Sequence, residues 1–173
     1  MPKPSDSGSI ASDYRGANRE NDSLAKGTFI QRLFSILFML PAWFAPHTRL
    51  RVFFHRLRGA KIGNNVEIGY FVILDNVHPH LVVIEDDCVI TARVSILSHD
   101  NSYYYTHGLP VKIGQTTIRQ GAFIGIGAVI LPTLTVGELA IVGPNSVVTR
   151  DVVQRAVVAG IPAKEIKRVE SKE

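Results

Sequence analysis

Histidines are the side chains of this sequence best suited to moving protons, and four of the six lie in two short stretches. His78 and His80 fall in one stretch, and His99 and His107 fall in the other. Imidazole titrates near neutral pH, so it can take a proton from a weak nucleophile and pass it to a leaving group. Which histidine does so depends on the elements that carry it.

The number of cysteines and the net charge limit the kinds of site that the chain can form. The chain holds a single cysteine, Cys88, which excludes an intramolecular disulfide and a cysteine-based zinc site. This usage agrees with a reducing cytoplasm, where we expect the protein to act. The formal net charge of +4 fits an anionic ligand or an anionic surface. We expect no nucleic-acid partner and no bound metal.

Aliphatic residues recur at every sixth position through most of residues 59–156. A period of six matches neither a helix nor a hairpin, and it is typical of short strands joined by tight corners in stacked coils. The sequence therefore predicts an all-β solenoid, a parallel β-helix, whose aliphatic residues point toward its axis. These residues are Ile62, Ile68, Leu74, Ile84, Ile90, Ile96, Ile118, Ile124, Ile130, Val136, Val142 and Val148.

Small residues mark the corners between the predicted strands. Four positions after each aliphatic residue lies a small or branched side chain, such as Ala122, that fits a crowded corner. Glycine often follows the aliphatic residue directly, and we expect it to supply positive φ where the chain turns. The glycines in question are Gly63, Gly69, Gly125, Gly137 and Gly143.

Two insertions break the repeat, and loops on a rigid scaffold are where sites tend to lie. Four extra residues fall around residues 77–80, and a longer loop spans residues 98–117. One coil plus the short insertion separates residues 75–78 from the His99 segment, so the two segments should lie about 4.8 Å apart. The side chains expected beside His99, which suit a polyhydroxylated ligand, are Asp75, Asn76 and His78.

The ends of the chain depart from the repeat. Residues 1–28 are polar and predict a disordered tail. Residues 29–58 show apolar side chains at helical spacing, interrupted at Pro41 and Pro46, with arginines on the other side of the second helix. We expect these helices to pack at one end of the β-helix. In residues 157–173 we expect a short basic helix that closes the last coil.

The apolar run at residues 33–45 is shorter than the roughly 20 residues that span a bilayer. Basic residues alternate with bulky apolar ones after this run, as they do in interfacial helices. We therefore expect residues 29–57 to make peripheral contact with a membrane, at its inner face, without crossing it.

Three segments resemble the hexapeptide-repeat acyltransferases, in particular the sugar O-acetyltransferases related to galactoside and maltose acetyltransferases. They are Phe123–Pro132, Val142–Asp151 and Ala159–Lys164, and the resemblance extends over about residues 59–168. It implies a left-handed β-helix, a homotrimer, and active sites in the clefts between neighbouring subunits.

The resemblance also implies an activity, the transfer of an acetyl group from acetyl-CoA to a hydroxyl of a sugar-like acceptor. His99 matches the position of the family's catalytic histidine. The resemblance implies that His99 acts as a general base, which deprotonates the acceptor hydroxyl as this hydroxyl attacks the thioester. The family binds coenzyme A along the coils. The matching positions here are Phe123, Gly125, Ile126 and Gly143, with Thr149, Arg150 and Lys164 near the nucleotide end.

Two other functions share this fold class. A γ-class carbonic anhydrase uses three histidines on zinc, and the four histidines named above would supply enough imidazoles. That family's ligand pattern is missing from the sequence, whereas the coenzyme A-type segments are present. A non-catalytic β-helix scaffold is the second alternative, and it predicts no binding of acetyl-CoA.

Overall fold

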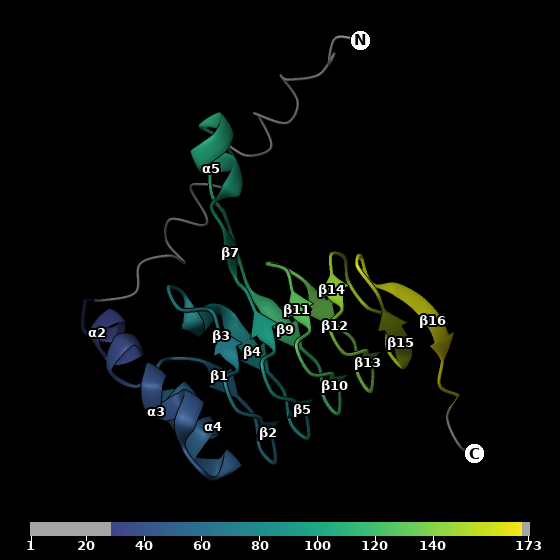
Figure 1. Cartoon of the computed structure of the whole chain (residues 1–173), viewed down its shortest axis with the longest axis horizontal. Helices are drawn as coiled ribbons and strands as arrows, with labels where there is room; N and C mark the ends of the chain where they lie inside the picture. Colours follow the sequence, from purple (N-terminus) through teal and green to yellow (C-terminus); the bar gives the residue numbers. More distant parts are fainter. Residues whose placement is uncertain (1–28, 171–173) are drawn as a thin grey trace.

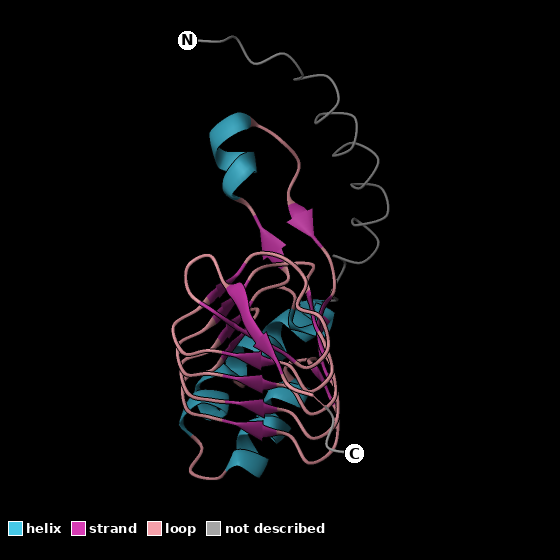
Figure 2. Cartoon of the chain, turned by 90° about the vertical axis from the view of Figure 1, so that its right-hand side faces the viewer, coloured by secondary structure: helices cyan, strands magenta, loops and turns pink. Residues whose placement is uncertain are grey.

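The computed structural model describes residues 29–170, with side chains from residue 33 onward. Residues 1–28, the predicted disordered tail, lie outside the described residues. Most of the described chain winds into a triangular prism of stacked coils, shown from the side in Figure 1 and along its axis in Figure 2. Three helices lie against the first coils of the prism, and a narrow arm projects from it.

Successive strands visit three sheets in turn, so three strands make one coil. The first sheet contains β1 (Lys61–Ile62), β4 (Val82–Ile84), β9 (Thr116–Ile118) and β12 (Thr135–Val136). The second contains β2 (Glu67–Ile68), β5 (Val89–Ile90), β10 (Phe123–Ile124), β13 (Ile141–Val142), β15 (Ala156–Ala159) and β16 (Lys164–Arg168). The third contains β3 (Ile73–Leu74), β6 (Ser95–Ile96), β11 (Val129–Ile130) and β14 (Val147–Val148).

The pairing of the strands confirms the predicted repeat. Phe123 pairs in parallel with Ile141, eighteen residues further along, and the same residue pairs with Val89 across the long insertion. The repeating aliphatic residues from Ile68 to Val148 are buried on the axis, whereas Ile62 is partly exposed at the open end of the first coil. Each coil therefore packs its apolar layer on that of the next coil.

Glycines after the aliphatic positions do not supply positive φ, so that prediction is wrong. Positive φ falls two residues later, at positions such as Asn65, Gly127 and Asn145, where asparagine and glycine tolerate the left-handed region. The predicted glycines instead allow neighbouring coils to approach closely. A Cβ added at Gly69 would lie 2.5 Å from the backbone nitrogen of Ala92.

Helices α2 (Phe29–Leu37), α3 (Met39–Phe44) and α4 (Thr48–Leu57) confirm the helical segment and its break at Pro46. Pro41 does not break the chain as predicted. It lies in the first turn of α3, where a backbone N–H has no partner within its helix, so the missing N–H costs little. No helix of the described residues is long and apolar enough to cross a membrane.

Helix α4 covers the open edge of the first coil with polar groups. An edge strand presents unpaired backbone groups, and Thr48 Oγ1 accepts a hydrogen bond from the N–H of Ile68 while Arg51 Nε donates to its carbonyl. Arg56 donates to the carbonyls of Ile62 and Gly63. The free carbonyl groups of the first coil need hydrogen-bond donors, which explains why Arg51 and Arg56 lie against the prism.

The insertion at residues 98–117 forms an ordered arm. Strands β7 (His99–Asp100) and β8 (Lys112–Ile113) pair in antiparallel fashion and carry α5 (Ser102–His107) at their tip, which Figures 1 and 2 show projecting from the prism. The shorter insertion forms the 3-10 helix η1 (Pro79–Leu81).

The predicted C-terminal helix is wrong, because residues 164–168 form a strand. The chain turns at Gly160, which has a φ of 100°, and β16 returns antiparallel to β15. Strand β15 is the outermost parallel strand of its sheet, and a helix could not supply partners for its free backbone groups. The segment does cover the last coil, as expected, but it does so as a strand and not as a helix.

Candidate active site

His99 forms a short contact with Asp75 at the base of the arm. Strands β3 and β6 pair Leu74 with Ile96, so the residues that follow them lie on adjacent coils. His99 Nδ1 lies 2.6 Å from Asp75 Oδ2. The side chain of His99 is 20% exposed, and that of Asp75 is fully buried. The predicted proximity of the two residues is confirmed.

Asp75 is a buried carboxylate whose oxygens are fully used. Its Oδ1 accepts hydrogen bonds from the N–H groups of Val77 and His78, and its Oδ2 accepts from Ser98 N and His99. Burial alone would raise the pKa of Asp75, but the hydrogen bonds from His99, His78 and Ser98 hold it well below its usual range. Asp75 therefore stays ionised beside the imidazole.

The Asp75 carboxylate orients the His99 ring and favours its protonated form. The hydrogen bond that His99 donates to Asp75 is the largest influence on the imidazole, and it raises the pKa of His99 although partial burial acts in the opposite direction. Because Nδ1 faces Asp75, Nε2 lies on the opposite edge of the ring. Such an imidazole can accept a proton at Nε2 while the carboxylate stabilises the resulting charge.

The two other predicted acceptor residues have different surroundings. The His78 ring is buried and lies at 83° to the His99 ring, with 5.4 Å between centroids. Asn76 is exposed, and its Oδ1 accepts a hydrogen bond of 3.0 Å from Arg58. The structure therefore places Asp75 and His78 against His99, whereas the Asn76 side chain is bonded to Arg58 at the end of α4.

Arg58 is a site-supporting residue that the sequence did not reveal. Its buried guanidinium donates to Ser35 O, His55 Nδ1 and Asn76 Oδ1. Burial lowers the pKa of Arg58 to about 10, against the opposing charge of Asp75. Burial, followed by the charges of the arginines, lowers the pKa of His55 to about 3, so this histidine is a neutral acceptor. One feature of the sequence could have indicated it, because Arg51, His55 and Arg58 recur at helical spacing and so share one side of the helix.

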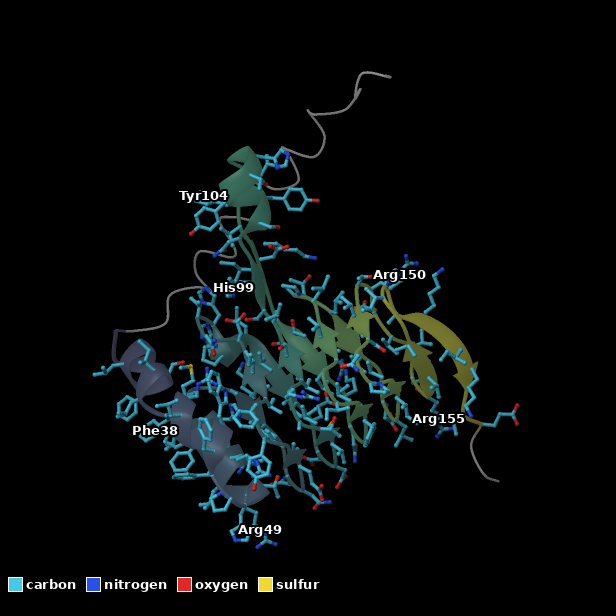
Figure 3. All side chains as sticks on the ribbon, in the orientation of Figure 1. Phe38, Arg49, His99, Tyr104, Arg150 and Arg155 are labelled. Atoms are coloured by element: carbon cyan, nitrogen blue, oxygen red, sulfur yellow. The ribbon has the colours of Figure 1, made fainter. Side chains whose placement is uncertain are left out.

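The predicted donor residues fall on two edges of the prism. Arg150 follows β14 of the third sheet, on the same edge where His99 follows β6, with β11 between the two strands. Figure 3 shows both labelled residues on one side of the prism. Arg150 and Lys164 line an open cleft of about 320 Å³, together with Asp151 and Glu165. Thr149 is exposed beside them.

The other donor set lies on the edge between the second and third sheets. Gly125 follows β10 and Gly143 follows β13, and these strands are paired. Their N–H groups donate to Val142 O and Val158 O, so they are already used within the stack. Ile126 and Phe123 expose apolar side chains on this side. Within one chain this set lies on a different edge from Arg150, whereas Lys164 pairs with Ala159 of β15, the strand next to β13.

His78, His80 and His99 are neighbours by ring contact. Even so, no group of three His, Cys, Asp or Glu side chains among the described residues has an arrangement that could hold a metal ion. The buried Cys88 donates to the carbonyl of Arg119, and burial raises the pKa of its thiol to about 11.

Comparisons with known proteins agree with the six-residue repeat and the fold. The family described as bacterial transferase hexapeptide (six repeats) matches residues 115–150. Protein CapG of Staphylococcus aureus is 33% identical over 125 residues, which cover 68% of this chain and 71% of CapG. The galactoside O-acetyltransferase of Escherichia coli is 29% identical over 122 residues, covering 64% of this chain and 58% of that protein.

Coverage of other relatives is lower, since the chain spans 44%, 27% and 60% of the length of three further curated proteins. Among solved structures, a hexapeptide-repeat acetyltransferase of Vibrio cholerae complexed with acetyl-CoA gives a TM-score of 0.68 at 20% identity. The match covers 82% of this chain and 88% of that one, and it establishes the fold. With its stacked six-residue repeat and its similarity to CapG, the chain belongs to the hexapeptide-repeat acyltransferase family.

Proposed function

We propose that this protein transfers the acetyl group of acetyl-CoA to a hydroxyl of a sugar-like acceptor. The observation that carries the proposal is the contact of 2.6 Å between His99 Nδ1 and the buried, ionised Asp75. A partly exposed imidazole held by a carboxylate is suited to general-base catalysis. The names of the E. coli galactoside O-acetyltransferase and of the V. cholerae acetyltransferase support this reaction class.

The reaction balances without a further co-reactant. His99 Nε2 accepts the hydroxyl proton as the acceptor oxygen attacks the thioester carbonyl. The tetrahedral intermediate collapses with cleavage of the C–S bond, and the imidazolium returns the proton to the thiolate. The products are the O-acetylated acceptor and free coenzyme A. A general base of this kind contributes roughly 10²–10⁴ in rate.

The acceptor lies beside His99, near Asn76 and His78, where amide and imidazole groups bind hydroxyls. The donor extends along the edge from His99 toward Arg150 and Lys164. Two coil steps separate β6 from β14, a distance of about 10 Å. The two cations suit the phosphates of the nucleotide end, whereas Asp151 and Glu165 in the same cleft limit how closely phosphate can approach.

The assembly that we propose is a homotrimer of left-handed β-helices in the cytoplasm. Its support is the division of the donor residues between two edges of the prism. In a trimer, the edge with Phe123, Gly125, Ile126 and Gly143 of one chain would face the His99 edge of its neighbour, so one donor contacts both sets. The proposed membrane contact of residues 29–57 depends on the exposed apolar side chains of helices α2–α4.

A transfer assay with a panel of mono- and oligosaccharides tests the activity. We expect release of the coenzyme A thiol that depends on the acceptor, together with an O-acetylated product detected by mass spectrometry. The His99→Ala variant is the control and should form product at least about a hundredfold more slowly. Binding of acetyl-CoA without transfer to any hydroxylated acceptor would favour the scaffold alternative.

A further inference from the structure

Helices α2–α4 turn their large apolar side chains away from the prism. A helix packed on a soluble core buries its apolar stripe. Here the buried positions are small or polar apart from Val52, and they are Ser35, Ala42, Arg51, Val52 and His55. Nine large apolar side chains of these helices have exposed fractions between 38% and 69%. We call them the helical face: Leu33, Phe34, Ile36, Leu37, Leu40, Phe44, Leu50, Phe53 and Leu57.

Aromatic rings make this face continuous across the helices. The Phe38 ring stacks on Phe34 at 5.6 Å and on Phe54 at 5.9 Å, and Phe54 contacts Phe53 at 5.4 Å between centroids. Figure 3 shows Phe38 on the side of the helices turned away from the prism. Contiguous exposed apolar surface of this kind marks an interaction site.

Charge indicates which partner the face suits. Residues 29–58 hold five arginines and no aspartate or glutamate. The first acidic residue after them is Glu67 on β2. Arg49 and Arg56 are exposed along the border of the face. Glu67 lines the same cleft as Arg49 and Arg56, so cations still outnumber anions beside the face. Apolar side chains flanked by an excess of cations match the interior and the anionic headgroups of a lipid leaflet.

Two other occupants fit less well. Residues 1–28 contain few large apolar side chains, namely Met1, Ile10, Tyr14 and Leu24, and cannot match nine exposed ones. A second copy paired through the same face about a twofold axis would set Arg49 and Arg56 against the partner's cations, with Glu67 as the single carboxylate in the cleft that they line.

We propose that the helical face docks on an anionic lipid membrane as a monotopic surface. The docking would also orient the site, a step that rests on the proposed function. Ser35 of α2 donates from Oγ to the carbonyl of Asn76, and Asn76 is adjacent to the carboxylate that holds His99. One layer of residues therefore separates the membrane-facing side of α2 from the proposed acceptor position beside His99. This arrangement favours a glycan precursor anchored to lipid as the acceptor.

Flotation of the full chain with lipid vesicles tests the docking. We expect co-migration with vesicles of phosphatidylcholine and phosphatidylglycerol, and weaker binding to phosphatidylcholine alone. The Phe34→Ser/Leu37→Ser variant should bind at least roughly tenfold more weakly, since it loses two exposed apolar contacts. A matched control, Leu139→Ser/Ile166→Ser, changes two exposed apolar residues elsewhere and should bind as the native protein does. Arg49→Glu should weaken binding to the anionic vesicles only.

Fluorescence gives a readout that is independent of activity, because Trp43 in α3 is the single tryptophan of the chain. Brominated lipid should quench its emission in the native protein and the control, but less in Phe34→Ser/Leu37→Ser. Equal flotation of all variants, or no flotation, would overturn the proposal. A smaller particle mass for Phe34→Ser/Leu37→Ser in lipid-free solution would show that a second copy covers the face. Failure of the sugar transfer assay would leave the vesicle result standing.

Discussion

The contact between His99 and Asp75 has a direct consequence for pH dependence. The hydrogen bond that His99 donates to Asp75 raises the pKa of His99 above its ordinary value of 6.5. A general base must be neutral, so kcat/KM should rise as pH rises through this elevated pKa. In Asp75→Asn the carboxylate is lost, and the ascending limb should move to lower pH while the plateau falls, because the histidine tautomer is no longer fixed. Paired pH–rate profiles measure both effects, and a limb that stays in place or moves to higher pH would contradict the assignment.

Replacing His99 separates the base from the other histidines. His99→Ala should lower kcat by roughly 10²–10⁴ and leave the affinity for acetyl-CoA within a few-fold, because the proposed donor cations lie two coils away. His107→Ala should cost much less, because His107 lies at the end of α5 and contacts Thr106. Single-turnover kinetics and acetyl-CoA titration measure these quantities. An active His99→Ala beside an inactive His107→Ala would reverse the choice of histidine.

The site residues that lie on coils of the six-residue repeat could be predicted from the sequence. Once the six-residue period is known, the coil length brings Asp75 to the segment of His99, and the contact follows from strand spacing. The role of Arg58 could not be predicted, because it depends on how α4 lies across residues far along the chain. Arginine at a helical surface position is usually solvated, and only the packed structure shows its acceptors.

At the scale of the element, α4 and the Asp75 segment are joined by the buried Arg58. Arg58→Met would leave Ser35 O, His55 Nδ1 and Asn76 Oδ1 without this donor, and each buried acceptor left unpaired costs about 1–3 kcal/mol. We expect a loss of about 2–4 kcal/mol in the free energy of unfolding. Urea unfolding at matched protein concentration measures it. The exposed Arg49→Met should stay within about 0.5 kcal/mol, and equal effects of the two changes would argue against a supporting role for Arg58.

Elements were predictable where local periodicity decides them. The strands of the prism follow from their aliphatic period, and helices α2–α4 follow from theirs. The arm of β7, α5 and β8 has no repeat to reveal it. Strand β16 was predicted as a helix because Lys164–Arg168 is short and basic, and what decides its structure is the free edge of β15, a tertiary requirement. The burial of Arg51 has the same kind of origin, in the free edge of β2.

At the scale of the whole molecule, the proposed donor path ends at the last coil. Arg150→Glu/Lys164→Glu should raise the KM for acetyl-CoA by at least about tenfold, since each charged hydrogen bond is worth about 1.5–3 kcal/mol. Arg155→Glu/Lys167→Glu makes the same change of charge at the same end of the prism, and Figure 3 shows Arg155 on the side away from Arg150. Steady-state kinetics with varied acetyl-CoA compare the two, and similar KM values would mean that the donor lies elsewhere.

The proposed trimer makes a prediction about mixed assemblies. If each site combines the His99 edge of one chain with the Ile126 edge of its neighbour, His99→Ala and Ile126→Glu damage different halves of the same site. Both variants should be inactive alone. Random mixed trimers made by co-expression should regain about a quarter of native activity per site, because one site in four then receives two intact halves.

The matched control mixes two variants of one edge. His99→Ala and Asp75→Asn alter the same half, so every site in their mixed trimers carries a damaged base, and activity should lie between those of the two parents. Native mass spectrometry verifies that mixed trimers have formed. Recovery in the first mixture but not in the second requires a site shared between chains. Equal activity of the two mixtures, with trimers present, would mean that each chain carries a complete site and that the Ile126 edge takes no part in it.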